Sequence, residues 1–489
     1  MTSDPATPEN SDIFHAPPLL ARNSLILIVV EVLAKALGLL VFVLMARRVG
    51  ATDLGVFAFA VSLSNLVTLL PRYGFEGYVQ RELPRSPEAF PRLWATIVAV
   101  KLFLSAIAVG VVLVALWMGR FPIVKSWVVL LVLSSTLLTA FVLFHTACFR
   151  AFQRAGYVAQ VRLVYSGLYA ILGLLALQAG FGVAGVAAVL VMAGVTGVIH
   201  SVWLLHRRVH ALTLSVDPVA MRLVLKESLP FFLLILVILL YNQIDVVLLS
   251  FLSGDREVGI YAAAMKMFEA TALIPAGIMG AVLPALARDW AVSKTQFAAT
   301  FKAAFQYLTM LGLPLAAGST ICASKLIHLL YGSQYGRSIS VLQILIWAAV
   351  FSFWNHLLFV ALIAMDRERD LLKIGAGGVV ISIGMNMLLI PPYGALGSSV
   401  AIVITEASLF LMALRPMLRE TINSLDLATV LVNPSLCTGA MAIVLWLISG
   451  SPLLLLISVG IGVYFTGLLA RGAVRPAQLK ALLSRSSQG

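Results

Sequence analysis

The stretch LPFFLLILVILLYNQIDVVLLSFLSGDREVGIYAAAMKMFEA, residues 229–270, sets isolated charges inside long apolar runs. Asp245 lies in the first run, and Lys266 and Glu269 lie in the second. An ionisable side chain at the centre of a bilayer costs roughly 2.5–3.5 kcal/mol on insertion scales, so such residues face a helix-bundle interior or a water-filled space. The stretch therefore predicts membrane-spanning helices with a polar side.

The composition of the whole chain agrees with that interpretation. Of its 489 residues, 61% are hydrophobic and only 11% are charged, and the mean hydropathy is +1.01. A soluble domain carries roughly 25% charged residues. Apolar runs of about 20 residues are helices in a bilayer, because unpaired backbone groups are costly in lipid. We therefore predict an all-α polytopic membrane protein with about 14 spans, at 21–46, 54–78, 93–118, 124–148, 157–179, 183–206, 227–252, 258–287, 300–324, 340–365, 371–390, 395–415, 429–449 and 451–470.

The charges predict a topology. Residues 1–20 are polar and acidic and lack the basic start of a signal peptide, so we expect a disordered cytoplasmic tail. With this end inside, most of the 34 Lys and Arg residues, Lys101 and Arg162 among them, fall on the cytoplasmic side, as does the basic tail 471–489. The net charge of +13 is spread over many short loops, which argues against nucleic acid as a partner.

Motifs for enzymatic chemistry are missing from the sequence. It has no Walker A motif, no dinucleotide fingerprint and no HExxH. The three cysteines, Cys148, Cys322 and Cys437, lie in separate apolar segments without metal-ligand spacing, and we expect them to be buried apolar residues. These observations predict a protein that is not an enzyme and that needs no metal or cofactor.

The chain repeats itself. Residues 22–60 align without gaps with residues 226–264, which places Gly55 on Gly259 and Phe57 on Tyr261. The hairpin GFGVAGVAAV (180–189) aligns in the same way with PYGALGSSVA (392–401). Six spans make one unit, and because six is even the two repeats are parallel. We therefore predict an N-terminal lobe at 21–206, a linker at 207–226, a C-terminal lobe at 227–415 and two extra helices at 429–470, with a substrate path through a central cavity.

Ionisable residues within the spans are the candidates for function. Cationic side chains in a cavity would attract an anionic group, and acidic ones could balance charge or take up a coupling proton or cation. The candidates for substrate binding are Lys35, Lys266 and Arg72, and those for coupling or charge balance are Asp245, Glu31 and Glu269. The alternative is that Glu31 with Lys35, and Lys266 with Glu269, are ion pairs that only fix helix packing. Arg72 could extend to the headgroups, and for His145 and His356 a packing role is favoured.

Several motifs resemble one family. LMARRVGATDLGVFAFAVSL (44–63), RYGFEGYVQREL (72–83), DVVLLSFLSGDREVGIYAAAMKMFEA (245–270), VLPALARDW (282–290) and PPYGALGSSVAIVITEA (391–407) resemble the polysaccharide transporter, or oligosaccharide flippase, family. That family is part of the multidrug/oligosaccharidyl-lipid/polysaccharide exporter superfamily. The resemblance covers roughly 20–415 and is specific in the order and spacing of the motifs, not in the substrate. Asp245 matches the family's acidic position in the seventh helix, and Gly259 and Tyr261 match its Gly-x-Tyr turn.

The resemblance implies a fold and a function. It implies two six-helix lobes around a central cavity. It also implies alternating-access transfer of a lipid-linked oligosaccharide, commonly on undecaprenyl diphosphate, across the bacterial inner membrane for O-antigen, exopolysaccharide or capsule synthesis. A polysaccharide polymerase and glycosyltransferases would be partners. On this hypothesis Lys35 and Lys266 engage the diphosphate, and Asp245 balances charge or couples.

Three alternatives stay open. A lipid II flippase shares the frame, but its first helix is expected to carry an arginine-rich run where this chain has LAKALGLLVFVLMARRVG (33–50). A cation-coupled multidrug exporter is expected to show a tight acidic cluster in one lobe, whereas the charges here are mixed in sign. The third alternative is a non-transporting subunit of a polysaccharide assembly machine.

Overall fold

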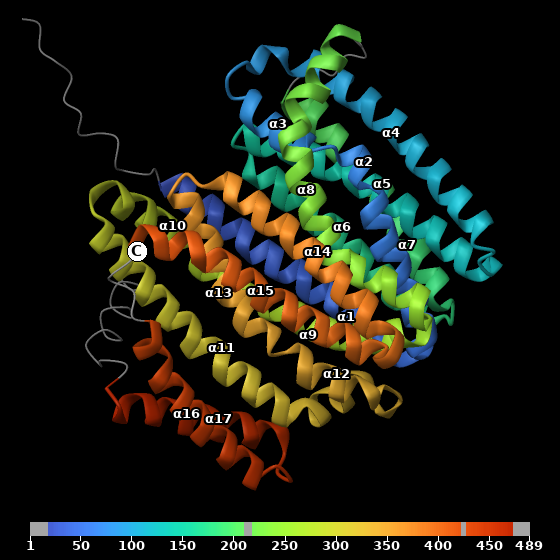
Figure 1. The fold of residues 1–489 in the computed structure, drawn as a ribbon. Helices are drawn as coiled ribbons and strands as arrows, with labels where there is room; N and C mark the ends of the chain where they lie inside the picture. The colour runs from blue at the N-terminus through green and yellow to red at the C-terminus, as the bar shows by residue number, and fades with distance from the viewer. Residues whose placement is uncertain (1–17, 210–217, 422–426, 473–489) are drawn as a thin grey trace, which may run out of the picture. The chain divides into compact units, whose positions relative to one another are not determined.

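The computed structural model describes residues 18–209, 218–421 and 427–472, and these ranges are helical and contain no strand (Figure 1). The predictions for the tails and for the linker fall wholly or partly outside them. The helices are α1 (Pro18–Val67), α2 (Leu69–Arg72), α3 (Phe75–Glu82), α4 (Phe90–Met118), α5 (Ile123–Ala151), α6 (Ala155–Gln178), α7 (Gly182–Arg208), α8 (Pro218–Ser253), α9 (Asp255–Thr271), α10 (Leu273–Val292), α11 (Lys294–Tyr331), α12 (Arg337–Leu345), α13 (Ala348–Ala364), α14 (Glu368–Tyr393), α15 (Ala395–Thr421), α16 (Leu427–Leu447) and α17 (Leu453–Ala470). Two short 3-10 helices, η1 (Pro87–Ala89) and η2 (Ser333–Tyr335), join them.

Thirteen segments of the described chain are long and apolar enough to cross a membrane. The predicted spans 21–46 and 54–78 share one candidate segment, Ile26–Val67, because α1 consists of two helices that meet at Gly50; the second prediction also runs past the end of α1 into α2 and α3. The helix changes direction at Gly50, whose φ of 81° and ψ of 175° suit a residue without a Cβ. The all-α membrane fold is confirmed, and one break at glycine accounts for the difference in the number of spans.

The contacts of the chain define two compact units. Unit 1 consists of the described residues up to Phe42 together with Val67–Ile235, and unit 2 consists of Val43–Leu66 together with the described residues from Leu236 onward. The last part of α1 therefore packs with the second half of the chain, and the first part of α8 packs with the first half. Residues 218–226, predicted as linker, form the first turns of α8. The division into lobes at 206 and 227 stays a prediction.

Unit 1 is held together by aromatic side chains of α3, α4 and α5. Phe75, Phe144 and Phe149 are fully buried in its core. Gly74 precedes α3 with a φ of 74°, and a Cβ there would overlap the side chain of Phe231 on α8. The glycine thus allows α3 and α8 to approach closely.

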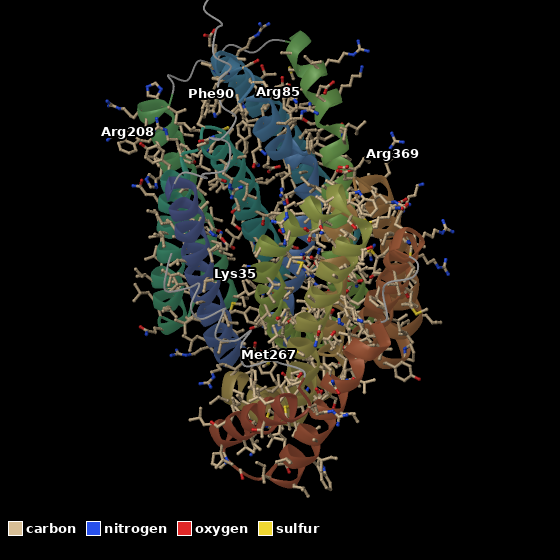
Figure 2. The ribbon with its side chains drawn as sticks, turned by 90° about the vertical axis from the view of Figure 1, so that its left-hand side faces the viewer. Lys35, Arg85, Phe90, Arg208, Met267 and Arg369 are labelled. Atoms are coloured by element: carbon tan, nitrogen blue, oxygen red, sulfur yellow. The ribbon has the colours of Figure 1, made fainter. Side chains whose placement is uncertain are left out.

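The helices α4–α7 run back and forth within unit 1. Figure 2 shows Arg85, Phe90 and Arg208 near one end of the unit, which is where α4 begins and α7 ends. The sequence predicts that this end is cytoplasmic. That prediction requires successive helices to alternate in direction, and the arrangement of α4–α7 within the unit agrees with it.

Unit 2 contains a crossing between the two repeats. Gly55 of α1 and Gly259 of α9 occupy equivalent repeat positions, as do Ala51 and Asp255. A Cβ on Gly55 would overlap the carbonyl group of Asp255, and a Cβ on Gly259 would overlap that of Ala51. The two helices therefore cross with their backbones in contact. The contact of Gly55 with Asp255 is equivalent, in the repeat, to the contact of Gly259 with Ala51.

The break in α1 is held by the end of α11 and by η2, which follows it. Arg47 donates to the backbone carbonyls of Leu329 and Leu330. Gln334 and Tyr335 donate in return to the carbonyl of Ala46, at 3.2 and 3.0 Å. These bonds satisfy polar backbone groups that the end of each helix leaves without intrahelical partners.

The main core of unit 2 lies between α10, α11, α13 and α15. Phe305, Trp354 and Phe410 stack within it, with ring centroids 5.1–6.5 Å apart. The last two long helices, α16 and α17, pack on α11 (Figure 1), where Cys322 and Cys437 are buried among apolar side chains. With Cys148 also buried, the prediction for the three cysteines is confirmed.

Candidate functional site

Asp245 is buried within unit 2 instead of lying open. It sits on α8, two turns before the helix ends, and α9 returns beside it after a reversal at Gly254. Only 2% of Asp245 is exposed, and its Oδ2 accepts a hydrogen bond from the hydroxyl of Tyr261. The Gly-x-Tyr turn thus has a direct role: it delivers the donor that makes a buried carboxylate tolerable.

A second layer of polar groups surrounds this pair. Ser398 of α15 interacts with the Tyr261 hydroxyl and donates to Oδ1 of Asn386 on α14, at 3.0 Å. Asn386 in turn donates to the backbone carbonyl of Ser382 at 2.8 Å. All of these residues are buried. Asn386 lies in the predicted span 371–390, and nothing in the sequence connects it with Asp245.

The first repeat lacks this polar pair. The alignment places Val41 opposite Asp245 and Phe57 opposite Tyr261, and both of these apolar residues are buried. The fold therefore accommodates an apolar residue at each position. Because the acid and the tyrosine occur together in one repeat, a need of the helix packing alone does not account for them.

Lys266 and Glu269 form the ion pair that their spacing predicts. The Lys266 ammonium donates to Oε2 of Glu269 at 2.7 Å on α9. Their side chains are 39% and 49% exposed, although the helix belongs to a candidate span. A charged pair that is not covered by protein is costly in hydrocarbon. We therefore expect this face of α9 to contact water.

Glu31 has a partner that the sequence did not predict. Its carboxylate accepts two hydrogen bonds from the Arg162 guanidinium of α6, both at 3.2 Å. The spacing of Glu31 and Lys35 predicted a pair within α1; instead the contact crosses between helices. Lys35, labelled in Figure 2, is exposed on α1. Arg162 is one of the cytoplasmic Lys and Arg residues that predict the topology, and nothing in its local sequence distinguishes it from the others.

Arg72 and Lys101 lie close together in unit 1. Arg72 contacts Glu76 at 3.4 Å, and its side chain is only 26% exposed, so it does not extend freely towards headgroups. Lys101, predicted to serve topology, is instead fully buried in α4. Its ammonium donates to the carbonyl of Pro71 at 2.9 Å and lies 5.4–5.7 Å from the centroids of three Phe rings, those of Phe75, Phe141 and Phe144. Lys101 thus ties α4 to α2.

A second buried carboxylate, Glu406 on α15, occurs in unit 2. It accepts hydrogen bonds from Tyr241 of α8 and Asn355 of α13, each at 2.7 Å. Its residue is 6% exposed. Tyr241 precedes Asp245 by one helical turn, so the donor to Glu406 and the other buried carboxylate occupy neighbouring positions of α8.

The two histidines differ in their surroundings. His145 is buried, and its Nδ1 is 2.8 Å from the hydroxyl of Ser201 on α7. His356 of α13 donates through Nδ1 to the carbonyl of Ser352 within its own helix. Within the described ranges, no group of three or more His, Cys, Asp or Glu side chains could hold a metal ion.

The comparison with protein families identifies the chain as a member of one of them. Residues 20–290 match the family described as polysaccharide biosynthesis protein. This match covers more than half of the sequence, and the chain belongs to that family.

Two curated relatives have informative names. "Probable flippase AglR" of Haloferax volcanii is 25% identical over 212 residues, which are 42% of this chain and 44% of the relative. "Putative O-antigen transporter" of Shigella dysenteriae is 29% identical over 194 residues, 39% of this chain and 48% of the relative. The chain thus spans about half the length of the curated relatives that it matches.

Solved structures with the same fold are membrane transporters. The lipid II flippase MurJ, in an inward closed conformation, has a TM-score of 0.78 at 14% identity, over 92% of this chain and all of that one. An inward-facing multidrug resistance transporter of the MATE family has a TM-score of 0.65 at 16% identity, over 80% and 96% of the two chains. At these identities the likeness shows the fold alone.

Proposed function

We propose that this protein is a flippase that moves a lipid-linked oligosaccharide across the bacterial inner membrane by alternating access. Membership of the polysaccharide biosynthesis family supports a role in making a surface glycan, and the names of both curated relatives agree with transport. The fold supports a transporter over an enzyme. An undecaprenyl diphosphate carrier, a cytoplasmic position for both termini and contact with a polymerase and glycosyltransferases belong to this proposal.

The observation that carries the proposal is the half-exposed ion pair of Lys266 and Glu269 in a candidate membrane span. A pair that only fixed the packing of helices would be covered by protein. The pair of Glu31 and Arg162 is also partly open, at 46% and 40% exposed. Diphosphate groups carry negative charge and form strong hydrogen bonds with cations. Helices that present cations at membrane depth therefore suit a phosphate-bearing lipid.

The candidate residues have different roles in this proposal. Lys35 and Lys266 engage the diphosphate, and Arg72 assists in unit 1 from beside Glu76. Glu269 and Glu31 balance charge when no substrate is bound. Asp245 is buried, so it acts as a coupling group that takes up a proton or cation and does not touch the glycan.

The test uses cells that lack the gene and carry plasmid copies of it. Lys35→Gln combined with Lys266→Gln should abolish the surface polymer, and finished lipid-linked units should collect in the inner leaflet. Lys294→Gln is the matched control, because Lys294 also pairs with a carboxylate, that of Glu420 at 2.9 Å, but is far more exposed. The assignment of the two lysines fails if the double variant exports normally at normal protein levels.

The deletion itself separates the competing functions. Loss of the surface glycan with unchanged growth supports the proposal. Loss of peptidoglycan and of viability would indicate a lipid II flippase, which the MurJ fold allows. Intact glycans with new sensitivity to cationic drugs would indicate a multidrug exporter.

A further inference from the structure

We infer that Glu406, Tyr241 and Asn355 form a proton-binding site in unit 2, separate from the site of Asp245, and that the state of Glu406 sets the direction of the Tyr241 hydroxyl. The contribution of this site to transport depends on the proposed function. The binding of a proton does not, and it can be measured in the purified protein.

The first argument is the kind of partner that Glu406 has. Its Oε1 accepts from a tyrosine hydroxyl and its Oε2 from an asparagine amide, and both donors are neutral. No ion pair involves Glu406 among the residues that the structure describes. A buried carboxylate without a counter-charge is stabilised by taking up a proton, because the neutral acid is far cheaper to bury.

The charged groups around the site do not replace that counter-charge. His356 of α13 is close enough for its charge to act on Glu406, but its Nδ1 donates to the backbone carbonyl of Ser352 and not to the carboxylate. Asp245 on α8 is an acid and supplies no positive charge. On α9, Lys266 is bound to Glu269, so this pair adds little net charge.

The second argument is that the hydrogen bonds of the site fit two protonation states. When Glu406 is ionised, the Tyr241 O–H donates to Oε1 across their 2.7 Å contact. When a proton from water binds Oε1, the acid O–H donates to the Tyr241 oxygen, and the tyrosine O–H must turn to another acceptor. The hydrogen bond from the side-chain amide of Asn355 to Oε2 is unchanged. A hydroxyl suits this exchange because it is both donor and acceptor.

The third argument is an unsatisfied acceptor one helical turn from Tyr241. Asp245 lies one turn further along the same face of α8. In the described structure its Oδ1 is buried and has no hydrogen-bond donor, although Tyr261 serves Oδ2. Protonation of Glu406 would therefore free the hydroxyl of Tyr241 one helical turn from the proposed coupling group.

The repeat provides a fourth, independent argument. The alignment places Leu37 opposite Tyr241, and continuing the hairpin alignment along the unbroken helices α7 and α15 places Gly194 opposite Glu406. Neither residue of the first repeat can bind a proton. The carboxylate and its tyrosine are thus additions to the second repeat, as Asp245 and Tyr261 are.

The test is infrared difference spectroscopy of the full chain in lipid nanodiscs as the pH is lowered. A band should appear in the C=O stretching region of protonated carboxylic acids and should shift in D2O. Because Asp245 and the exposed carboxylates also take up protons, the component assigned to Glu406 is the one that is lost in Glu406→Gln. That component should be present in Asp245→Asn, with a displaced midpoint because the two groups are coupled. Tyr241→Phe should keep the band and raise its frequency, because the acid loses its hydrogen-bond partner.

Glu257→Gln is the matched control, since that carboxylate is paired with Arg337 and should leave the band unchanged. A Glu406→Gln spectrum that keeps every component of the wild-type spectrum, or a component that disappears only in Asp245→Asn, overturns the assignment. If Glu406→Gln does not fold, the frequency shift in Tyr241→Phe decides the question. If the infrared spectra confirm the proton site but deletion of the gene leaves glycan export intact, the proposed function is refuted and the proton site stands.

Discussion

At the scale of single residues, the buried acid–tyrosine pair of unit 2 has an apolar counterpart in the same chain. Asp245 and Tyr261 occupy positions where the first repeat has Val41 and Phe57. Replacing one member of a buried hydrogen-bonded pair leaves its partner unsatisfied, whereas replacing both with apolar residues of similar shape is nearly neutral. The chain therefore supplies its own control for a stability experiment.

We expect Tyr261→Phe to destabilise the protein by about 1–3 kcal/mol, because Asp245 loses its donor. The double variant Asp245→Val, Tyr261→Phe should recover most of that loss. Glycan export should be absent in the double variant, since the coupling group is gone. Thermal unfolding in detergent and surface-polymer analysis measure the two effects. A double variant that exports normally would show that the pair has no part in transport.

At the scale of elements, the crossing of α1 and α9 depends on two equivalent glycines. We expect Gly55→Ala and Gly259→Ala each to destabilise the protein by about 1–3 kcal/mol or more, because the added Cβ overlaps a backbone carbonyl that cannot move without shifting its helix. Gly280→Ala in α10 is the matched control. A Cβ there meets nothing within 4 Å, so its thermal midpoint should stay equal or rise.

The result that would contradict this prediction is a normal thermal midpoint for both glycine variants. The crossing would then be loose enough to separate the helices without cost, and the mirror contacts at Ala51 and Asp255 would not contribute to the fold.

At the scale of the whole molecule, the distribution of Lys and Arg predicts the orientation in the membrane. In unit 1, Ile123 begins α5 and Arg208 ends α7, so three helices separate the two positions. We expect Ile123→Cys to react in intact cells with a membrane-impermeant maleimide, and Arg208→Cys to react only after permeabilisation. The native cysteines are buried and should give little background. The opposite labelling pattern would reverse the proposed direction of transport.

Much of this architecture could be predicted from the sequence because its cause is local. Apolar runs of spanning length must be helical in lipid, whatever they pack against. The repeat was visible because its glycines recur at equal spacing, and the Lys266–Glu269 pair follows from helical geometry alone. The number of segments differed by one because the two helices that meet at Gly50 adjoin without a loop and form one candidate segment.

Contacts between helices distant in sequence were decided only by the tertiary structure. The composition and periodicity of the chain determined an all-α membrane protein with a duplicated helical plan and a few charged positions inside it. Sequence spacing could not show that Glu31 binds Arg162, that Lys101 is enclosed by aromatic rings, or that Tyr241 connects Glu406 with the helix of Asp245. Each of these contacts depends on how helices are rotated and offset against one another, and that is settled by the packing of all their faces together.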